Sequence, residues 1–425
     1  MIKLVILSIM SFFLISCSMM QKEVVKSNAK VFDGEDMYIL FALRAEQIGD
    51  SASASELFTE LYEKSQKKEY IYRSLQNDLT AKSYKKVIKR VDALSQNIPN
   101  DAQLTRLKIV ALLGIYELNS AIKLSVKLAS DTKKVNDYLL TSEIYKKREE
   151  FDLALRYLES AYAKENNEKI LDQMSIVLYV NLGRKKEAIA HLETHSRILG
   201  CSKLVCSRLI AFYSNDNNID GLLSTYLRYY EIDSSEKIAK KIIQIYTYKQ
   251  DFPNLILFLE NSYKDDELLL QLYSNAKNYK KAYPLADKLY VETSDINYLG
   301  QSAIFEYESY TGIKSKTLLT NVVEKLEKVT KEDNQAIYLN YLGYILIDHN
   351  LDIKKGMNYV QKVLKVQPNS AFYLDSLSWG YFKLGECTKA KEIIQRVSKL
   401  EGGDDPEVMQ HIIEINKCLK NKKVK

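Results

Sequence analysis

The sequence predicts an all-α protein in which about eleven helix–turn–helix units stack as a solenoid and a C-terminal helix covers the last unit. Three observations support this fold class. Residues 336–403 contain two copies of one residue pattern. A small or aliphatic residue recurs at nearly the same interval along most of the chain. Only 5 Pro and 14 Gly occur in 425 residues, so few residues interrupt helices.

The two copies are the clearest repeat in the chain. Residues 339–346 (LNYLGYIL) align with residues 374–381 (LDSLSWGY). The second halves recur 34 residues apart and pair Gly356, Val360, Val363 and Pro368 with Ala390, Ile394, Val397 and Gly402. A unit of this length and spacing resembles the tetratricopeptide (TPR) repeat, whose helix pairs stack into a right-handed superhelix. A single unit cannot bury its own apolar face, so the resemblance implies a stacked array.

Residues 1–17 (MIKLVILSIMSFFLISC) differ from the repeats. A lysine precedes an apolar run that is too short for the roughly 20 residues of a membrane-spanning helix. This order, ending at Cys17, resembles a bacterial lipoprotein signal, which implies removal of residues 1–16 and lipidation of Cys17. The serine that follows the cysteine matches the outer-membrane sorting default of such lipoproteins. An ordinary secretory signal is the alternative. Residues 17–35 lack periodicity, and we expect them to form a lipidated tether.

Residues 36–403 form the expected repeat array. Its register is defined by the residue that opens the second helix of each unit: Ala54, Val87, Ala121, Ala154, Ala188, Leu222, Leu255, Ala282, Leu319, Gly356 and Ala390. Seven of the ten steps lie within one residue of 34. Small residues at these positions let helix axes approach at the short end of about 8–10 Å. The short step into Ala282 predicts a truncated helix near 260–264, and the register of 260–335 stays open.

Residues 404–425 follow the last repeat. Two aspartates and Pro406 suit the first turn of a helix, which we expect to reach about Leu419 and to cap the array. The tail from Lys420 to Lys425 carries four lysines. We expect a solvated end there rather than a contact with an anionic surface.

Four cysteines remain besides Cys17, an even number that suits an oxidising compartment. If the cap continues the repeat register, Cys387 and Cys418 lie near the same end of neighbouring helices, and we expect a disulfide between them. Cys201 and Cys206 would then pair locally. The alternative is that all four are reduced core residues.

A possible zinc site is the other interpretation of one cysteine pair. His191 and His195 lie four residues apart and precede Cys201 and Cys206, which offers four zinc ligands. The HExxH arrangement of metalloproteases is absent. A local disulfide and unconnected structural residues are the alternatives. Because no phosphate-binding loop, nucleophile elbow or paired-carboxylate signature occurs, we expect no enzyme activity and neither a metal nor another cofactor.

The first helices of such units line the inner surface of the array. The register places nine residues on or near that surface: Tyr72, Arg106, Lys240, Tyr248, Asn340, Tyr344, Asp375, Trp379 and Phe382. Trp379 is the single Trp, and Tyr344 holds the equivalent position one unit earlier. In one interpretation this aromatic pair anchors a partner peptide. In the other, both residues pack against the cap helix.

The net charge and the resemblance to TPR repeats and lipoproteins limit the possible functions. The formal net charge is +6 and is spread over the chain, and export argues against nucleic acid as a partner. The resemblance implies a non-enzymatic, protein-binding scaffold held by lipid at the periplasmic face of the outer membrane. Its partners would be envelope proteins or peptides of a machine for barrel insertion, pilus or secretin biogenesis, or polysaccharide export. A glycan-binding regulator of peptidoglycan synthesis is the second hypothesis, and a zinc-dependent enzyme is the third.

Overall fold

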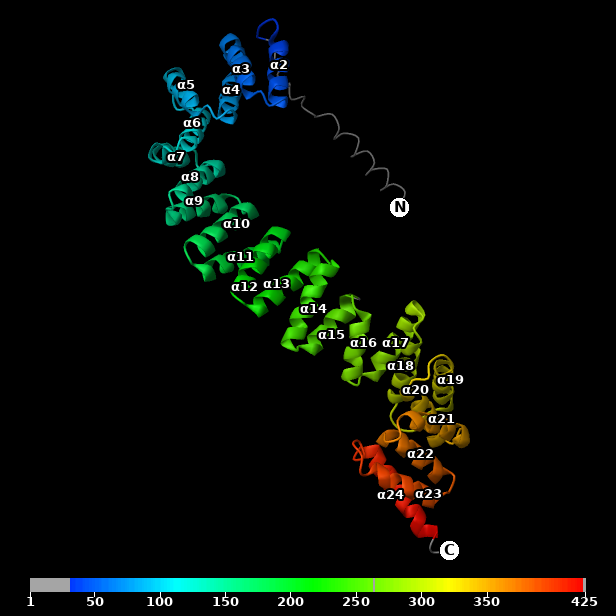
Figure 1. The fold of residues 1–425 in the computed structure, drawn as a ribbon. Coiled ribbons are helices and arrows are strands. Elements are labelled where there is room, and N and C mark those ends of the chain that lie inside the picture. The colour runs from blue at the N-terminus through cyan, green and yellow to red at the C-terminus, as the bar shows by residue number, and fades with distance from the viewer. Residues whose placement is uncertain (1–30, 263, 423–425) are drawn as a thin grey trace, which may run out of the picture. The chain divides into compact units, whose positions relative to one another are not determined.

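Figure 1 shows the computed structural model of the chain, which describes residues 31–262 and 264–422. Every regular element within these residues is helical, which confirms the all-α prediction. The helices of the described residues follow one another as eleven pairs and a last single helix, in agreement with the predicted number of units. No helix in this part of the chain is long and apolar enough to cross a bilayer.

The chain divides into two compact units, the first ending at Arg228 and the second beginning at Tyr229. The first unit contains α2 (Glu35–Gln47), α3 (Ser51–Ser65), α4 (Lys68–Thr80), α5 (Tyr84–Asn97), α6 (Ala102–Gly114), α7 (Leu118–Thr132), α8 (Val135–Lys147), α9 (Phe151–Lys164), α10 (Glu168–Ile176) with its π-helical extension η1 (Val177–Asn181), α11 (Lys185–Leu199), α12 (Lys203–Asn215) and most of α13 (Ile219–Ile232).

The second unit contains the remaining helices, which Figure 1 colours from green to red. They are α14 (Glu236–Lys249), α15 (Phe252–Ser262), α16 (Asp266–Asn275), α17 (Tyr279–Thr293), α18 (Ile296–Glu308), α19 (Lys316–Glu332), α20 (Ala336–Asp348), α21 (Ile353–Val366), α22 (Ala371–Lys383), α23 (Cys387–Val397) and α24 (Pro406–Lys422).

The predicted register residues hold the same place in the second helix of each pair. Each register residue is the fourth residue of its helix, from Ala54 in α3 to Ala390 in α23. All six alanines in the series are fully buried. The approach is closest between α20 and α21, where a Cβ atom added to Gly356 would lie 2.5 Å from the carbonyl oxygen of Gly343. Small residues are therefore required at this contact because backbone meets backbone.

The turn inside each pair has a recurring backbone conformation. Five residues before the register residue, most pairs place a residue with positive φ: Gly49, Lys82, Tyr116, Glu149, Gly183, Asn217, Gln250, Lys277 and Gly385. The next N–H closes the turn onto the first helix, as from Glu150 to the carbonyl of Tyr145 at 3.0 Å. Six of the nine are not glycine, although the left-handed region costs other residues about 1–2 kcal/mol. Stacking of the helices therefore imposes this turn.

The truncated helix expected near residues 260–264 is present. α15 has 11 residues and α16 has 10, whereas α13 and α14 have 14 each. The two shortened helices account for the short step into Ala282.

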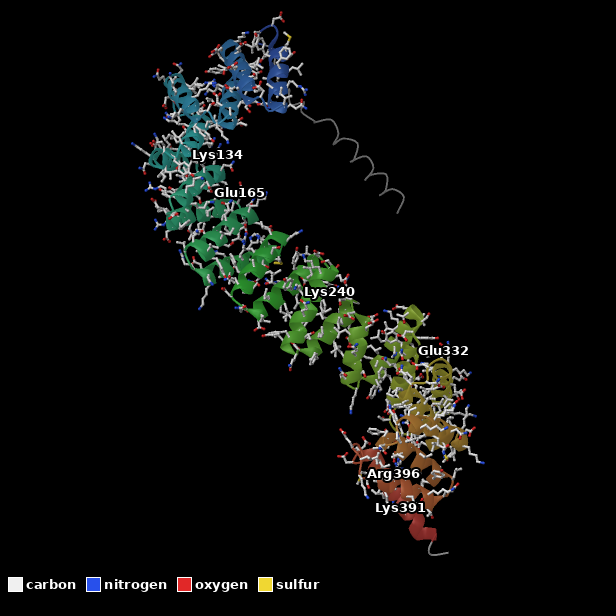
Figure 2. All side chains as sticks on the ribbon, viewed as in Figure 1. Lys134, Glu165, Lys240, Glu332, Lys391 and Arg396 are labelled. Carbon is white, nitrogen blue, oxygen red and sulfur yellow. A yellow bond between two sulfur atoms is a disulfide. The ribbon has the colours of Figure 1, made fainter. Side chains whose placement is uncertain are left out.

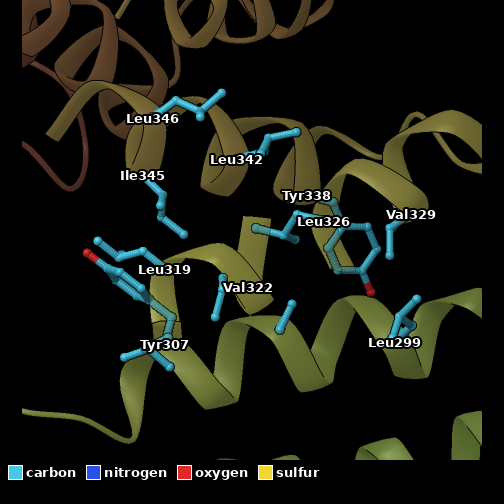
Figure 3. Packing of buried hydrophobic residues seen from close by; sticks show 12 residues of the cluster. Leu299, Tyr307, Leu319, Val322, Leu326, Val329, Tyr338, Leu342, Ile345 and Leu346 are labelled. Carbon is cyan, nitrogen blue, oxygen red and sulfur yellow. The ribbon is translucent and has the colours of Figure 1, made fainter. Parts of the chain in front are cut away.

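The sequence left the register of α19 open, and the structure decides which of its residues are buried. The fully buried residues are Val322, Leu326 and Val329, whereas Val323, four residues after the register residue Leu319, is only partly buried. A long connection, residues 309–315, replaces the tight turn of the other pairs, so a tight turn does not set the orientation of α19 about its axis. Figure 3 shows these side chains packed together with Leu299, Tyr338, Leu342 and Ile345 from α18 and α20.

The cap helix covers the last pair. Val408 and Ile415 of α24 are buried and join a core cluster with Ala390 and Ile394 of α23. In Figure 1, α24 lies beside α22 and α23. An apolar face of the last repeat that would otherwise meet water is thereby buried, which is the role expected of a cap.

Candidate partner-binding cavity

In the first unit, the two predicted inner-face residues are Tyr72 and Arg106, and both form hydrogen bonds with neighbouring repeats. The hydroxyl of Tyr72 donates to Asp101 at 2.6 Å. Arg106 donates through Nε and Nη2 to the two carboxylate oxygens of Asp137, at 2.6 and 2.8 Å. The Asp137 side chain is fully buried, so removing Arg106 would leave a buried charge without its partner. These two residues hold repeats together and offer little free polar surface.

The two predicted residues on α14 are exposed and remain separate from the others. Lys240, marked in Figure 2, pairs with Glu236 one helical turn away. The side chain of Tyr248 is 77% exposed. Neither residue lines the cavity formed by the predicted residues of α20 and α22.

Trp379 is not the open anchor for a partner that the binding interpretation requires. It is 8% exposed, its indole Nε1 donates to Asp348 at 2.8 Å, and its ring stacks on His411 of α24 with centroids 3.9 Å apart. Phe382 stacks on the indole with centroids 4.6 Å apart. The tryptophan therefore packs against the cap helix, and neither ring is an open anchor for a partner. The sequence left this alternative open because it does not place α24 over α22.

Tyr344, Asn340 and Asp375 come together at a cavity of about 610 Å³ in the second unit. Its lining residues come from α18, α20, α22 and α24 and from the segments next to them; Figure 1 labels these four helices. Four tyrosines and four carboxylates line it: Tyr307, Tyr341, Tyr344, Tyr373, Glu308, Asp375, Asp405 and Glu407. Its size is typical of ligand-binding pockets. Three of the nine predicted residues thus meet at one site.

The hydroxyl groups of the cavity are held as neutral donors. Tyr344 donates to Glu407, and Tyr341 donates to Glu308 at 3.3 Å. Burial, reinforced by the nearby Glu407 carboxylate, raises the pKa of Tyr344 well above its usual range. Burial likewise raises the pKa of Tyr341, with Glu308 adding to the effect. Both phenols therefore stay protonated and add no negative charge to the cavity.

Burial also acts on the charged groups in the wall. It raises the pKa of Glu308, and the nearby Lys314 ammonium offsets this only in part. Burial lowers the pKa of Lys314. The ammonium donates to the carbonyl oxygens of Tyr307, at 2.7 Å, and Tyr310. The positive charge is thus directed at backbone oxygens, and carboxylates dominate the rest of the wall.

Two acceptors in this wall have no partner. Oδ1 of Asn340 and Oδ1 of Asp375 are buried and receive no hydrogen bond. Asp375 is 5% exposed, and its other oxygen, Oδ2, lies 2.8 Å from Nδ1 of His411. A buried acceptor without a donor costs about 1–3 kcal/mol. Each residue is the fifth of its helix, in α20 and α22, so the two hold equivalent positions in consecutive repeats.

The four cysteines of the described residues lie in helices or just before one. Cys387 begins α23 and Cys418 lies in α24, and their Cα atoms are 6.0 Å apart. Cys201 and Cys206 are separated by 5.4 Å between Cα atoms. The structure joins both pairs through their sulfur atoms, which are the two pairings expected from the sequence. Cys17 lies outside the described residues.

The arrangement around the two histidines does not fit a zinc site. His195 is buried and its Nδ1 lies 2.7 Å from the Tyr162 hydroxyl. Cys201 and Cys206 are bonded to each other, so their sulfurs are not available as thiolate ligands. Within residues 31–262 and 264–422 no group of three or more metal-binding side chains converges.

Sequence reasoning missed several residues of the cavity wall, among them Glu308, Lys314 and Glu407. Glu308 ends α18 and Lys314 lies in the long connection that follows it, where the repeat spacing fails and predicts no position. Glu407 lies in the first turn of α24, and its acidic character there was a usable signal. Its hydrogen bond with Tyr344 spans 63 residues and required the fold.

No protein-family model matches the chain. A TPR repeat-containing protein of the archaeon Methanocaldococcus jannaschii is 24% identical over 302 residues, which cover 68% of this chain and 48% of that relative. The chain thus spans about half the length of this curated relative. The similarity and the helix pairs together indicate a TPR-type repeat protein.

Solved structures give weaker matches. One of Naa15/Naa10 bound to HypK-THB covers 82% of this chain and 65% of that chain, with 13% identity and a TM-score of 0.35. The Cut9–Hcn1 hetero-tetramer of APC/C covers 91% of this chain and 97% of that chain, with 10% identity and a TM-score of 0.34. Neither these structures nor the archaeal relative bears on a lipid anchor.

Proposed function

We propose that this protein is a non-enzymatic scaffold that binds other proteins and is anchored by lipid at the periplasmic face of the outer membrane. There it would help to assemble or regulate an envelope complex, such as one for barrel insertion, pilus or secretin biogenesis, or polysaccharide export. The observation that carries the binding role is the cavity between α20, α22 and α24, whose wall holds two buried acceptors without donors. A repeat array supplies the extended surface around it.

Two features support the location. Residues 1–17 contain, in order, a positive residue, an apolar run and a cysteine in the arrangement of a lipoprotein signal. The two pairs of neighbouring cysteines in the described chain suit a compartment that oxidises thiols. Multiple acylation of Cys17 would give firm anchoring, because a single acyl chain binds membranes only marginally.

The glycan-binding alternative is less well supported. It requires basic and aromatic inner-face side chains that are free to contact a sugar polymer. Arg106 is instead bound to the buried Asp137, and Trp379 is covered by α24. We therefore favour polypeptide partners.

Photo-crosslinking in intact cells tests the scaffold role. A photoreactive residue at Phe372, an exposed residue in the cavity wall, should capture a discrete set of envelope proteins identified by mass spectrometry. The same residue at Tyr116, which is 76% exposed in the first unit, is the control for non-specific capture. Recovery of muropeptides alone at Phe372 would contradict the proposal.

Membrane fractionation tests the anchor. Cys17→Ala should release the chain from membranes or leave an uncleaved precursor without lipid. Retention of the variant in outer membranes through a high-salt wash would contradict lipid anchoring.

A further inference from the structure

Two acceptor atoms in the wall of the cavity of the second unit have no hydrogen-bond donor. Oδ1 of Asn340 and Oδ1 of Asp375 can only accept, and both are buried without a partner in residues that line the cavity. Asp375 is 95% buried, so bulk water does not satisfy its carboxylate freely. Because buried polar groups in native proteins are nearly always paired, these two oxygens indicate a ligand that donates hydrogen bonds.

The charges around these atoms favour a donor with positive charge. Glu308, Asp405 and Glu407 add carboxylates to the wall, and Lys314 is the one basic residue among the described residues that line it. The Lys314 ammonium is taken up by the carbonyl oxygens of Tyr307 and Tyr310 and lies 4.5 Å from the centre of the Tyr307 ring. It therefore compensates the other carboxylates only in part.

The aromatic wall suits the same ligand. The rings of Tyr341, Tyr344 and Tyr373 line the cavity, and tyrosine rings attract ammonium and guanidinium groups. Two apolar residues of the wall, Ile337 and Phe372, are about half exposed. They provide apolar surface for the aliphatic stem of a long side chain and for the chain that carries it.

Resting on the proposed scaffold function, we propose that this cavity receives a lysine or arginine side chain presented by a partner polypeptide. The charged head donates to Oδ1 of Asp375 and Oδ1 of Asn340, and Tyr341 and Tyr344 flank it. The binding site requires two consecutive repeats, because its two acceptors come from equivalent positions of α20 and α22. The cap helix completes the wall with Glu407, which bonds to Tyr344.

Peptide binding to the full chain tests this proposal. The pentapeptides Gly-Ser-Lys-Ser-Gly and Gly-Ser-Arg-Ser-Gly, acetylated and amidated, are compared with the norleucine peptide, which has nearly the same shape without the charge. Titration calorimetry measures affinity, and fluorescence of Trp379, the single Trp, reports on the wall because its ring stacks on His411 beside Asp375. We expect the norleucine peptide to bind at least about tenfold more weakly, as for loss of a charge-assisted hydrogen bond.

Two variants assign the binding to the cavity. Asp375→Asn keeps the shape and an oxygen for His411 but replaces the free acceptor by an amide donor, so lysine binding should fall at least about tenfold. Glu401→Gln removes one charge from an exposed residue of the same unit and should leave binding unchanged. Melting curves of both variants verify that each is folded.

The outcomes separate this proposal from the scaffold role. Equal binding of the lysine and norleucine peptides, binding of neither, or an unchanged affinity in folded Asp375→Asn would overturn it. Binding of 1,5-diaminopentane but of no peptide would also overturn it, in favour of a small amine. Capture of envelope proteins at Phe372 would in each case leave the scaffold role standing, because that measurement does not depend on a basic side chain.

Discussion

Substitution of Gly356 by alanine should destabilise the second unit through the contact of α20 with α21. The added Cβ atom would lie 2.5 Å from the carbonyl oxygen of Gly343 and 2.8 Å from Cγ1 of Ile347, whereas ordinary contacts begin at 3.4 Å. The helices must therefore separate by about 0.9 Å, the difference between 3.4 and 2.5 Å. Overpacking of this kind costs about 1–3 kcal/mol.

The gain in helix propensity opposes that cost. Alanine is favoured over glycine inside a helix by about 1 kcal/mol, so the net loss at Gly356 should be at most about 2 kcal/mol. Asn358→Ala is the matched control, because Asn358 is exposed on the same helix and its replacement raises propensity without adding a contact. The control should be neutral or slightly stabilising.

Thermal unfolding of the full chain, followed by circular dichroism, measures both variants. A loss of 1 kcal/mol lowers the melting temperature of a unit of this size by about 2–4 °C. Hydrogen exchange of the α20 and α21 amides locates the effect if the two units unfold separately. Gly343→Ala should weaken the same contact, and the double variant should lose less than the sum, because one separation relieves both clashes. A melting temperature for Gly356→Ala equal to or above that of the control would refute the reasoning.

Three further predictions concern other parts of the chain. Ala154→Leu adds three carbon atoms at a fully buried position, so overpacking should lower the urea-unfolding midpoint by the equivalent of about 1–3 kcal/mol, and an unchanged midpoint would contradict the register. Cys387→Ser removes the link to Cys418, which closes 31 residues, and the chain-entropy model gives a loss of about 3–4 kcal/mol. Faster hydrogen exchange in α24 should report that loss, and free thiols in the native protein would rule the bond out. Hydrogen bonding from Lys67 lowers the pKa of Glu35 from 4.5 to about 2, so its stabilisation is complete above pH 4.5 and is lost as the pH falls towards 2. Glu35→Gln should therefore flatten this acid-side loss in melting curves, and an unaltered pH dependence would count against it.

The repeat register was available from the sequence because it depends on spacing. Helices that pack closely need a small residue at the same place in each repeat unit, and residues such as Ala154, Ala188 and Ala390 show this place directly. The sequence also limited the cysteine pairings, since a repeat unit fixes which helix ends are neighbours. In α19 the sequence left the register open, because a long connection breaks the spacing on which the register rests.

The tertiary structure alone decided what the inner face contains. Tyr72 and Arg106 lie where the register places them, but their polar ends are occupied by Asp101 and Asp137 of the neighbouring repeats. The register also placed Trp379 correctly, and only the position of α24 shows that its ring is covered. Spacing identifies the face on which a residue lies, whereas its partners depend on how the helices stack.

The sequence by itself therefore determined the helix pairs, their number and the residues at their closest contacts, because each follows from a local pattern of about 34 residues. The candidate cavity follows from no such pattern. Its wall joins Glu308, Asn340, Asp375 and Glu407 from four helices. The unpartnered oxygens of Asn340 and Asp375 became recognisable only when every surrounding donor had been placed. Whether a buried polar atom is satisfied is a property of its whole environment, and residues distant in the sequence supply that environment only after the chain has folded.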